Sequence, residues 1–381
     1  MPRPFGVYVH FPWCTFRCPY CDFAVTTERP PADRRYGRAV LAELALRLGT
    51  GAFDGLAARS LYVGGGTPSL WDPAELAEVV AALRDRLRLG ADAEITIEAN
   101  PESTDPERLR AWRAAGVNRV SIGVQSFDPL VLAKLGRRHG PEAAERAIRL
   151  AAEVVGNVSV DLIYAARRSS VATARADAER AVAAGAAHVS AYALTVDAEV
   201  LAEDVPFARL ARAGRLPLPP PEDAVAQARA IRAALRRAGL RRYEISNFAR
   251  PGRASAHNRL YWEGESYLGL GAGAVGCFPE GDGLLRYANH RDAKRWLAEV
   301  EAGRLPTADE DHVDARGAHN EQVMLGLRTT DGVALAELSE RQRGELEGLL
   351  HARLAVVRRG RLVLTSRGMD VHSAVSERLF D

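Results

Sequence analysis

Six short apolar runs rich in β-branched residues constrain the fold of this chain more than any other feature of its sequence. They cover residues 6–10, 60–63, 94–98, 119–124, 158–164 and 188–195. The stretches between them space their apolar residues as helices do. Strands that alternate with helices form a parallel sheet through right-handed crossovers. Six such units fall short of a closed barrel, so we expect an α/β fold, a partial (β/α)6 barrel whose chemistry lies at the carboxyl ends of the strands.

The alternation stops after residue 245, which predicts three parts. We expect the barrel at 1–245, a linker region at 246–310 and a mainly helical C-terminal domain at 311–381. The linker region holds the Gly-rich loop 269–276 and is expected to be irregular, then mostly helical. A hairpin at RLVLTSRG before a final helix is similar to a winged-helix module. A small helical cap without DNA contact is favoured, because the net charge is close to neutral.

Composition and charge exclude several classes of protein. The 381 residues include 51 basic and 49 acidic side chains, a net charge of +2, which argues against a nucleic-acid partner. No apolar run approaches the ~18 residues of a membrane span, and the first residues lack a signal-peptide pattern. Three of the four Cys lie within eight residues, which indicates a metal or cluster site in a reducing compartment. We therefore expect a cytoplasmic protein without a membrane span.

The clustered cysteines, Cys14, Cys18 and Cys21, follow the first predicted strand. Three thiolates so closely spaced can each bind one iron of a [4Fe-4S] cluster, whereas simple electron-transfer clusters use four Cys ligands. The fourth iron would then be open to the amino and carboxylate groups of S-adenosylmethionine (SAM). A zinc site is the alternative, but zinc takes four ligands, and Cys277 is distant in sequence. The spacing favours the open cluster.

Small and charged residues follow the second and third predicted strands. The run Gly64–Pro68 permits close backbone approach to a ligand, although a plain turn explains it equally well. Glu98 ends the third strand, where a buried carboxylate needs a donor. A ribose hydroxyl or a cofactor ammonium would serve, and an ion pair with Arg is the alternative.

The segment YVHFPWCTFRCPYCDF resembles the cluster motif of radical SAM proteins. It is similar to oxygen-independent coproporphyrinogen III oxidases and to their relatives, the HemW haem chaperones, over nearly the whole chain. The resemblance implies a cluster on the three clustered Cys and SAM beside it, with Gln125, Arg137 and Asp161 at a second SAM site. The cofactor-binding residues that it implies are Tyr8, Tyr20, Gly65, Gly66, Thr67, Glu98, Gln125, Arg137, Asp161 and Ala193.

Two features favour the chaperone branch over the oxidases. Phe23 stands where the oxidases carry a further Cys, and the string His257-Asn258-Arg259-Leu260-Tyr261-Trp262 matches a chaperone motif associated with haem. A neutral imidazole binds haem iron well, and an aromatic pair can pack on a porphyrin. The alternative is a structural turn with buried aromatics. The haem candidates are His257, Asn258, Tyr261, Trp262 and Cys277; a lone Cys is more often a small buried hydrophobe.

The chain departs from the family pattern at two places. Ala165-Ala166-Arg167 replaces Gly-Leu-Pro beside the second SAM site, and Val275 replaces a His. The resemblance predicts a haem chaperone that binds a [4Fe-4S] cluster, SAM and haem, uses an electron donor, passes haem to apo-haemoproteins and is a monomer or homodimer. The departures motivate an alternative, a radical SAM methyltransferase or related modifying enzyme. Coproporphyrinogen oxidation is the weakest alternative.

Overall fold

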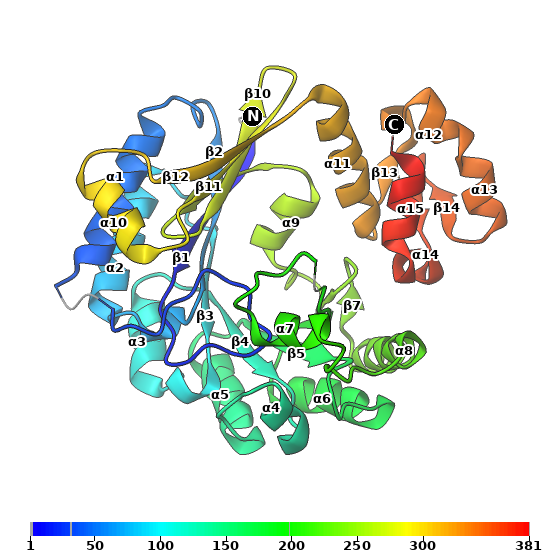
Figure 1. The fold of residues 1–381 in the computed structure, drawn as a ribbon, viewed down its shortest axis with the longest axis horizontal. Coiled ribbons are helices and arrows are strands. Elements are labelled where there is room, and N and C mark those ends of the chain that lie inside the picture. The colour runs from blue at the N-terminus through cyan, green and yellow to red at the C-terminus, as the bar shows by residue number, and fades with distance from the viewer. Residues whose placement is uncertain (1–2, 31–32, 198, 381) are drawn as a thin grey trace.

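The computed structural model describes residues 3–30, 33–197 and 199–380 (Figure 1). Six neighbouring parallel strands form the centre of its main sheet. They are β1 (Pro4–Phe11), β2 (Ala57–Gly65), β3 (Glu94–Ala99), β4 (Arg119–Gln125), β5 (Val158–Tyr164) and β6 (His188–Ala193). All six predicted strands are confirmed, and with them the partial barrel.

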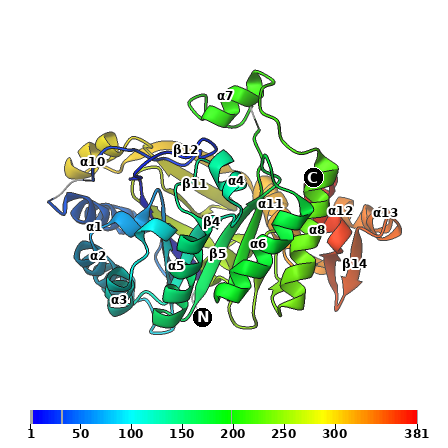
Figure 2. The same cartoon turned by 90° about the horizontal axis from the view of Figure 1, so that it is seen from below.

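Helices cover the outer face of this sheet and leave its concave inner face to the site (Figure 1). They are α1 (Arg35–Leu48), α2 (Pro73–Arg86), α3 (Pro106–Ala114), α4 (Pro129–Lys134), α5 (Pro141–Val154), α6 (Val171–Ala184) and α8 (Pro221–Arg237), with 3-10 turns η1 (Pro68–Leu70) and η2 (Pro101–Ser103). The short helix α7 (Pro206–Arg212) stands out from the body (Figure 2). No helix in the described ranges is long and apolar enough to cross a membrane.

The region after residue 245 extends the sheet, so the prediction of an irregular and then mostly helical region is wrong. At one end β9 (Ser266–Leu270) pairs parallel with β1, and β10 (Val275–Glu280), β11 (Gly283–Asn289) and β12 (Thr307–Val313) follow antiparallel. At the other end β8 (Asn247–Ala249) and β7 (Arg241–Arg242) follow β6. The described part of the sheet thus has twelve strands. The hairpin signal Gly281-Asp282 between β10 and β11 was missed. The edge strand β12 was missed because its sequence is mostly polar.

Two helices accompany this extension. The helix α10 (Ala293–Glu301) packs against α1, and α9 (Ala256–Trp262) lies in the concavity of the sheet against β1, β2 and β9. Glu94, at the start of β3, accepts hydrogen bonds from Ser255 Oγ and from the backbone N–H groups of Ala256 and His257. A carboxylate at a helix N-terminus satisfies donors that the helix cannot. The helix that carries the haem-associated string is therefore fixed to the inside of the barrel.

The C-terminal part is mainly helical with a hairpin, as predicted, and has a hydrophobic cluster of its own that includes Leu327, Leu362 and Leu379. Its elements are α11 (Ala315–Arg328), β13 (Val333–Ala334), η3 (Leu335–Glu337), α12 (Glu340–Gly344), α13 (Leu346–His351), β14 (Ala355–Arg358), β15 (Arg361–Leu364), α14 (Ser366–Asp370) and α15 (His372–Leu379). The predicted hairpin is displaced, since TSRG begins α14 and the strands pair over 355–364. The domain boundaries at 245 and 310 stay a prediction.

Candidate functional site

A cavity of about 420 Å³ lies at the carboxyl ends of the central strands, under the loop that carries the clustered cysteines. We call it the cofactor cavity. Its lining includes Cys14, Cys18, Cys21, Tyr20, Gly65, Gly66, Thr67, Glu98, Gln125, Arg137, Asp161 and Ala193. The structure therefore brings together every predicted cluster and cofactor residue except Tyr8. That side chain lies behind the cavity wall, stacked on Tyr62 with ring centroids 6.2 Å apart.

The three thiols border this cavity separately. Cys18 is buried, and Thr67 Oγ1 and an Arg137 Nη lie 3.4 and 3.5 Å from the sulfurs of Cys14 and Cys18. Burial raises the pKa of Cys14 and raises that of Cys21 to about 11. In the described part of the chain no three His, Cys, Asp or Glu side chains gather as a single metal ion requires. A [4Fe-4S] cluster needs a different arrangement, in which each thiolate binds a different iron. Hydrogen-bond donors near the sulfurs are suited to such thiolate ligands.

The glycine run owes its composition to packing within the protein. Gly65 has φ +113°, and a Cβ there would lie 2.6 Å from the ring of His10. A Cβ on Gly66 would lie 2.7 Å from the carbonyl oxygen of Trp13. The N–H groups of Gly65, Gly66 and Thr67 donate to Glu98, Phe11 and Trp13. These amides are thus already engaged within the protein, and the Thr67 hydroxyl contacts the sulfur of Cys14 and Asn100 Nδ2.

Two buried carboxylates give the cavity an affinity for cations. Glu98 accepts hydrogen bonds from Tyr62 Oη at 2.8 Å and from the Gly65 N–H at 3.0 Å, so its donors come from the protein and not from an Arg ion pair. Burial, followed by the nearby Asp161, raises its pKa to about 7. Burial also raises the pKa of Asp161, which accepts from Ser121 Oγ at 3.2 Å. A cationic ligand would relieve both groups, and SAM carries an ammonium and a sulfonium.

Arg137 and Gln125 shape the opposite wall. Arg137 donates to Asn100 Oδ1 at 2.5 Å and to the Gly123 carbonyl at 2.9 Å, while Asn100 Nδ2 donates to Thr67 Oγ1. Gln125 ends β4 with φ +67°, a left-handed conformation that is uncommon outside Gly. This strained strand end is where the ladder to β5 shifts its register.

Several lining residues were not predicted from the sequence. They are Tyr62, Asn100, Arg119, Ser121, Ser190 and Tyr192. A signal existed for most of them, because polar residues at alternate positions of a strand mark one face. Asn100 follows Glu98 by two residues at the same strand end.

The turn after β5 keeps its special backbone without the family's Gly. Ala165 has φ +55°, and its N–H donates to the buried Gln227 Oε1 at 2.9 Å. A left-handed Ala costs roughly 1–2 kcal/mol. Gln227, two turns into α8, holds the peptide in place, so the replacement changes side chains at the turn more than its path.

The haem candidates do not converge on one point. His257 is buried, with Nδ1 2.8 Å from Ser60 Oγ and Nε2 3.0 Å from Tyr261 Oη. Burial lowers its pKa to about 3, so the ring is neutral, but both nitrogens are already hydrogen-bonded. With both nitrogens engaged, neither is free to bind iron in this conformation, which favours the structural alternative; the role of His257 towards haem stays a prediction.

The other candidates point elsewhere. Asn258 lines the cofactor cavity, and Trp262 packs under the guanidinium of Arg328, 4.3 Å from its ring centroid. Cys277 is buried on β10, opposite Tyr267 of β9. Of the five haem candidates, Tyr261 lines a second hollow, which lies beside the cofactor cavity. The residues of the haem-associated string therefore contribute to several different parts of the structure.

The chain is similar to known proteins both in sequence and in fold. Residues 8–173 match the Radical SAM superfamily. The chain is 40% identical over 375 residues to the heme chaperone HemW of Mycobacterium tuberculosis, covering 98% of this chain and 94% of that protein. It is 37% identical to Escherichia coli HemW over 77% of this chain and 76% of that protein. The E. coli coproporphyrinogen III oxidase HemN shares the fold, with a TM-score of 0.80 over 99% of this chain and 90% of that chain at 21% identity.

Proposed function

Since this chain belongs to the HemW family of the radical SAM superfamily, we propose that it is a haem chaperone, which binds a [4Fe-4S] cluster, SAM and haem and passes haem to apo-haemoproteins. The observation that carries the proposal is 40% identity to a HemW protein over 98% of the chain. We further propose that it works in the cytoplasm as a monomer or homodimer and takes electrons from a separate donor.

We assign the cofactor residues from the geometry of the cofactor cavity. Cys14, Cys18 and Cys21 would hold the cluster, with Thr67 and Arg137 as hydrogen-bond donors to the sulfurs. When bound, the cluster and SAM supply one-electron chemistry at the sulfonium. Glu98 and Asp161, which both line the cavity, would orient the cationic groups of SAM.

The oxidase alternative lacks support at Phe23. This side chain occupies the position of the further Cys and is 59% exposed at the rim of the cofactor cavity. The methyltransferase alternative rests on Ala165-Ala166-Arg167, whose first residue preserves a left-handed turn.

Haem titration tests the proposal. The protein is reconstituted anaerobically with iron and sulfide and titrated with haem, and the Soret band is followed. We expect saturable binding near one equivalent and loss of the band on addition of an apo-haemoprotein, with gel filtration reporting the oligomeric state. Absence of saturable binding would refute the chaperone function. Formation of S-adenosylhomocysteine would then favour the methyltransferase, and consumption of coproporphyrinogen the oxidase.

A further inference from the structure

A second hollow, of about 450 Å³, lies next to the cofactor cavity and has no role in the assignments above. Its walls come from the end of the cysteine loop (Asp22, Phe23), from α9 (Tyr261), from β9 and β10 (Tyr267, Val275) and from the turn before α10 (Arg291). We call it the tyrosine hollow. Its volume is typical of small-molecule sites. Phe23 borders both cavities, so a ligand here would lie beside the cluster loop.

We propose that the tyrosine hollow is the seat of the haem, which rests its porphyrin face on the aromatic wall and directs a propionate to Arg291. This inference rests on the proposed chaperone function and assigns it a site. Tyr261 and Tyr267 pack edge to face, with centroids 4.7 Å apart, and Val275 adds an apolar side chain to the same wall. Aromatic and aliphatic surfaces of this kind suit the face of a macrocycle.

Charged groups at the rim of the tyrosine hollow are suited to the propionate groups of haem. The Arg291 side chain is 59% exposed and donates to the Asp22 carbonyl, while its ion pair with Asp22 Oδ1 is long at 3.7 Å. That Oδ1 is buried and has no hydrogen-bond partner. Arg is well suited to a carboxylate, so the exposed guanidinium can bind a propionate from the solvent side while it keeps its contact with the Asp22 carbonyl.

Iron ligation in the hollow is expected to be weak. Among the described residues that line it, His10 is the one imidazole, and its nitrogens are hydrogen-bonded to Tyr8 Oη at 2.9 Å and to the Ala24 carbonyl at 2.8 Å. Burial lowers the pKa of His10 to about 4, so it stays neutral. A seat that holds the porphyrin by its face and a propionate, without a strong axial ligand, suits a protein that must release haem.

The position of Val275 gives a direct test. Val275→His would add an imidazole to the wall, and we expect the Soret band of the haem complex to shift to that of an imidazole-ligated haem and haem to be released more slowly. The matched control is Val357→His, on an exposed position of β14. An unchanged spectrum of Val275→His at saturating haem would overturn the assignment, provided that circular dichroism shows the variant folded.

Arg291→Ala supplies a second, independent test. We expect haem affinity to fall about three- to tenfold, the range for one partly exposed ion pair, whereas Arg295→Ala on the exposed face of α10 should leave it unchanged. If Val275→His does not fold, equal haem affinity of the two Arg variants overturns the proposal. Failure of the unmodified protein to bind haem would instead refute the chaperone function, so the two failures are distinguishable.

Discussion

Replacing Glu98 by Gln should remove a pH dependence from the stability of this protein. Glu98 is buried, and its pKa rises from 4.5 to about 7 because of burial and then of Asp161. The folded state therefore keeps a proton that the unfolded chain loses, and stability falls as the pH rises from about 4.5 through 7. At 1.36 kcal/mol per pKa unit, ionised Glu98 costs the folded state about 3 kcal/mol. Gln keeps the size of the side chain but does not titrate in this range.

Chemical denaturation from pH 5 to 8 measures this effect. The unmodified protein and Glu98→Gln, both reconstituted, are unfolded in urea under anaerobic conditions. We expect the unmodified protein to lose most of about 3 kcal/mol relative to the variant across this range. The buried His10 and His257, whose lowered pKa values oppose this slope, are common to both proteins and cancel. Glu107→Gln, on an exposed position of α3, is the control. Parallel pH profiles for Glu98→Gln and the unmodified protein would refute the reasoning.

Two further changes test the assignments. Cys18→Ala should abolish the visible absorption of the reconstituted cluster and lower its iron content, whereas Cys277→Ala, far from the cofactor cavity, should retain both. Glu94→Gln should lower the free energy of unfolding by about 2 kcal/mol, measured by urea denaturation, because the amide nitrogen that replaces Oε2 cannot accept from the Ala256 N–H and leaves Arg119 without its ion pair at 3.9 Å. A loss within error of zero would show that this carboxylate oxygen does not fix the helix.

The sequence was most informative where a side-chain pattern has one structural meaning. Long apolar runs between helical segments predicted the six central strands, because buried parallel strands are apolar on both faces. The carboxyl ends of parallel strands meet at one edge, so residues as distant as Thr67 and Asp161 were correctly expected together. Tyr8 does not line the cofactor cavity; it stacks on Tyr62 and lines the tyrosine hollow, and its role towards the cofactor stays a prediction.

The strands outside the six-stranded centre were not predicted from the sequence. They pair at the edges of the barrel and have one polar face, so they lack a continuous apolar run. The sequence of β12, TADEDHV, is polar at most positions and is exposed, although it pairs with β11 over 307–313. Local propensity gives no strand there. The role of the haem-associated string could not be derived from the sequence for a related reason. A His beside Tyr and Trp is typical of a binding site and of a buried network alike, and only the burial of His257 between Ser60 and Tyr261 distinguishes the two.

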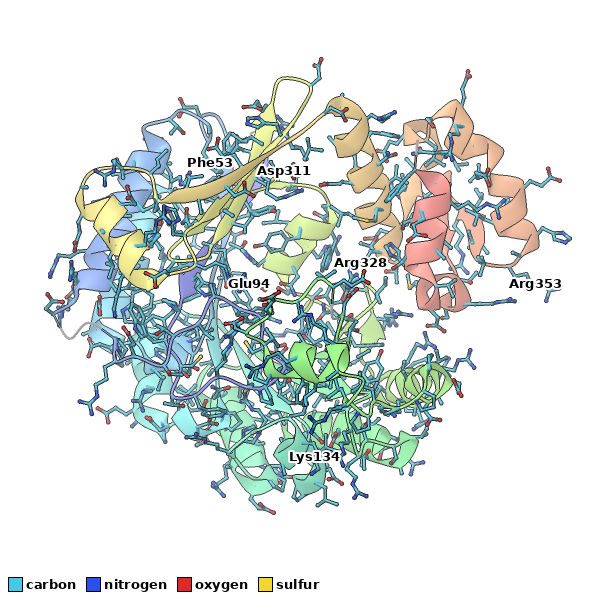
Figure 3. The ribbon with its side chains drawn as sticks, viewed as in Figure 1. Phe53, Glu94, Lys134, Asp311, Arg328 and Arg353 are labelled. Atoms are coloured by element: carbon cyan, nitrogen blue, oxygen red, sulfur yellow. The ribbon has the colours of Figure 1, made fainter. Side chains whose placement is uncertain are left out.

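The place of α9 explains why one short helix carries residues with different partners. Its N-terminus is held by Glu94, and near its C-terminus Trp262 packs on Arg328 of α11. Figure 3 labels Glu94 and Arg328. Arg328 also pairs with Glu244 at 2.8 Å, which links the barrel to the C-terminal part. Between these ends Asn258 faces the cofactor cavity and Tyr261 faces the tyrosine hollow.

The helix is therefore a shared wall of the two cavities, because positions three apart lie about 60° apart around a helix and can reach neighbouring spaces. A shift of α9 that opens one cavity must move the wall of the other. His257 ties the helix to β2 through the hydrogen bond between Nδ1 and Ser60 Oγ, while its Nε2 lies 3.0 Å from the Oη of Tyr261 on the same helix. If haem binds in the tyrosine hollow as proposed, the imidazole influences it through the position of Tyr261.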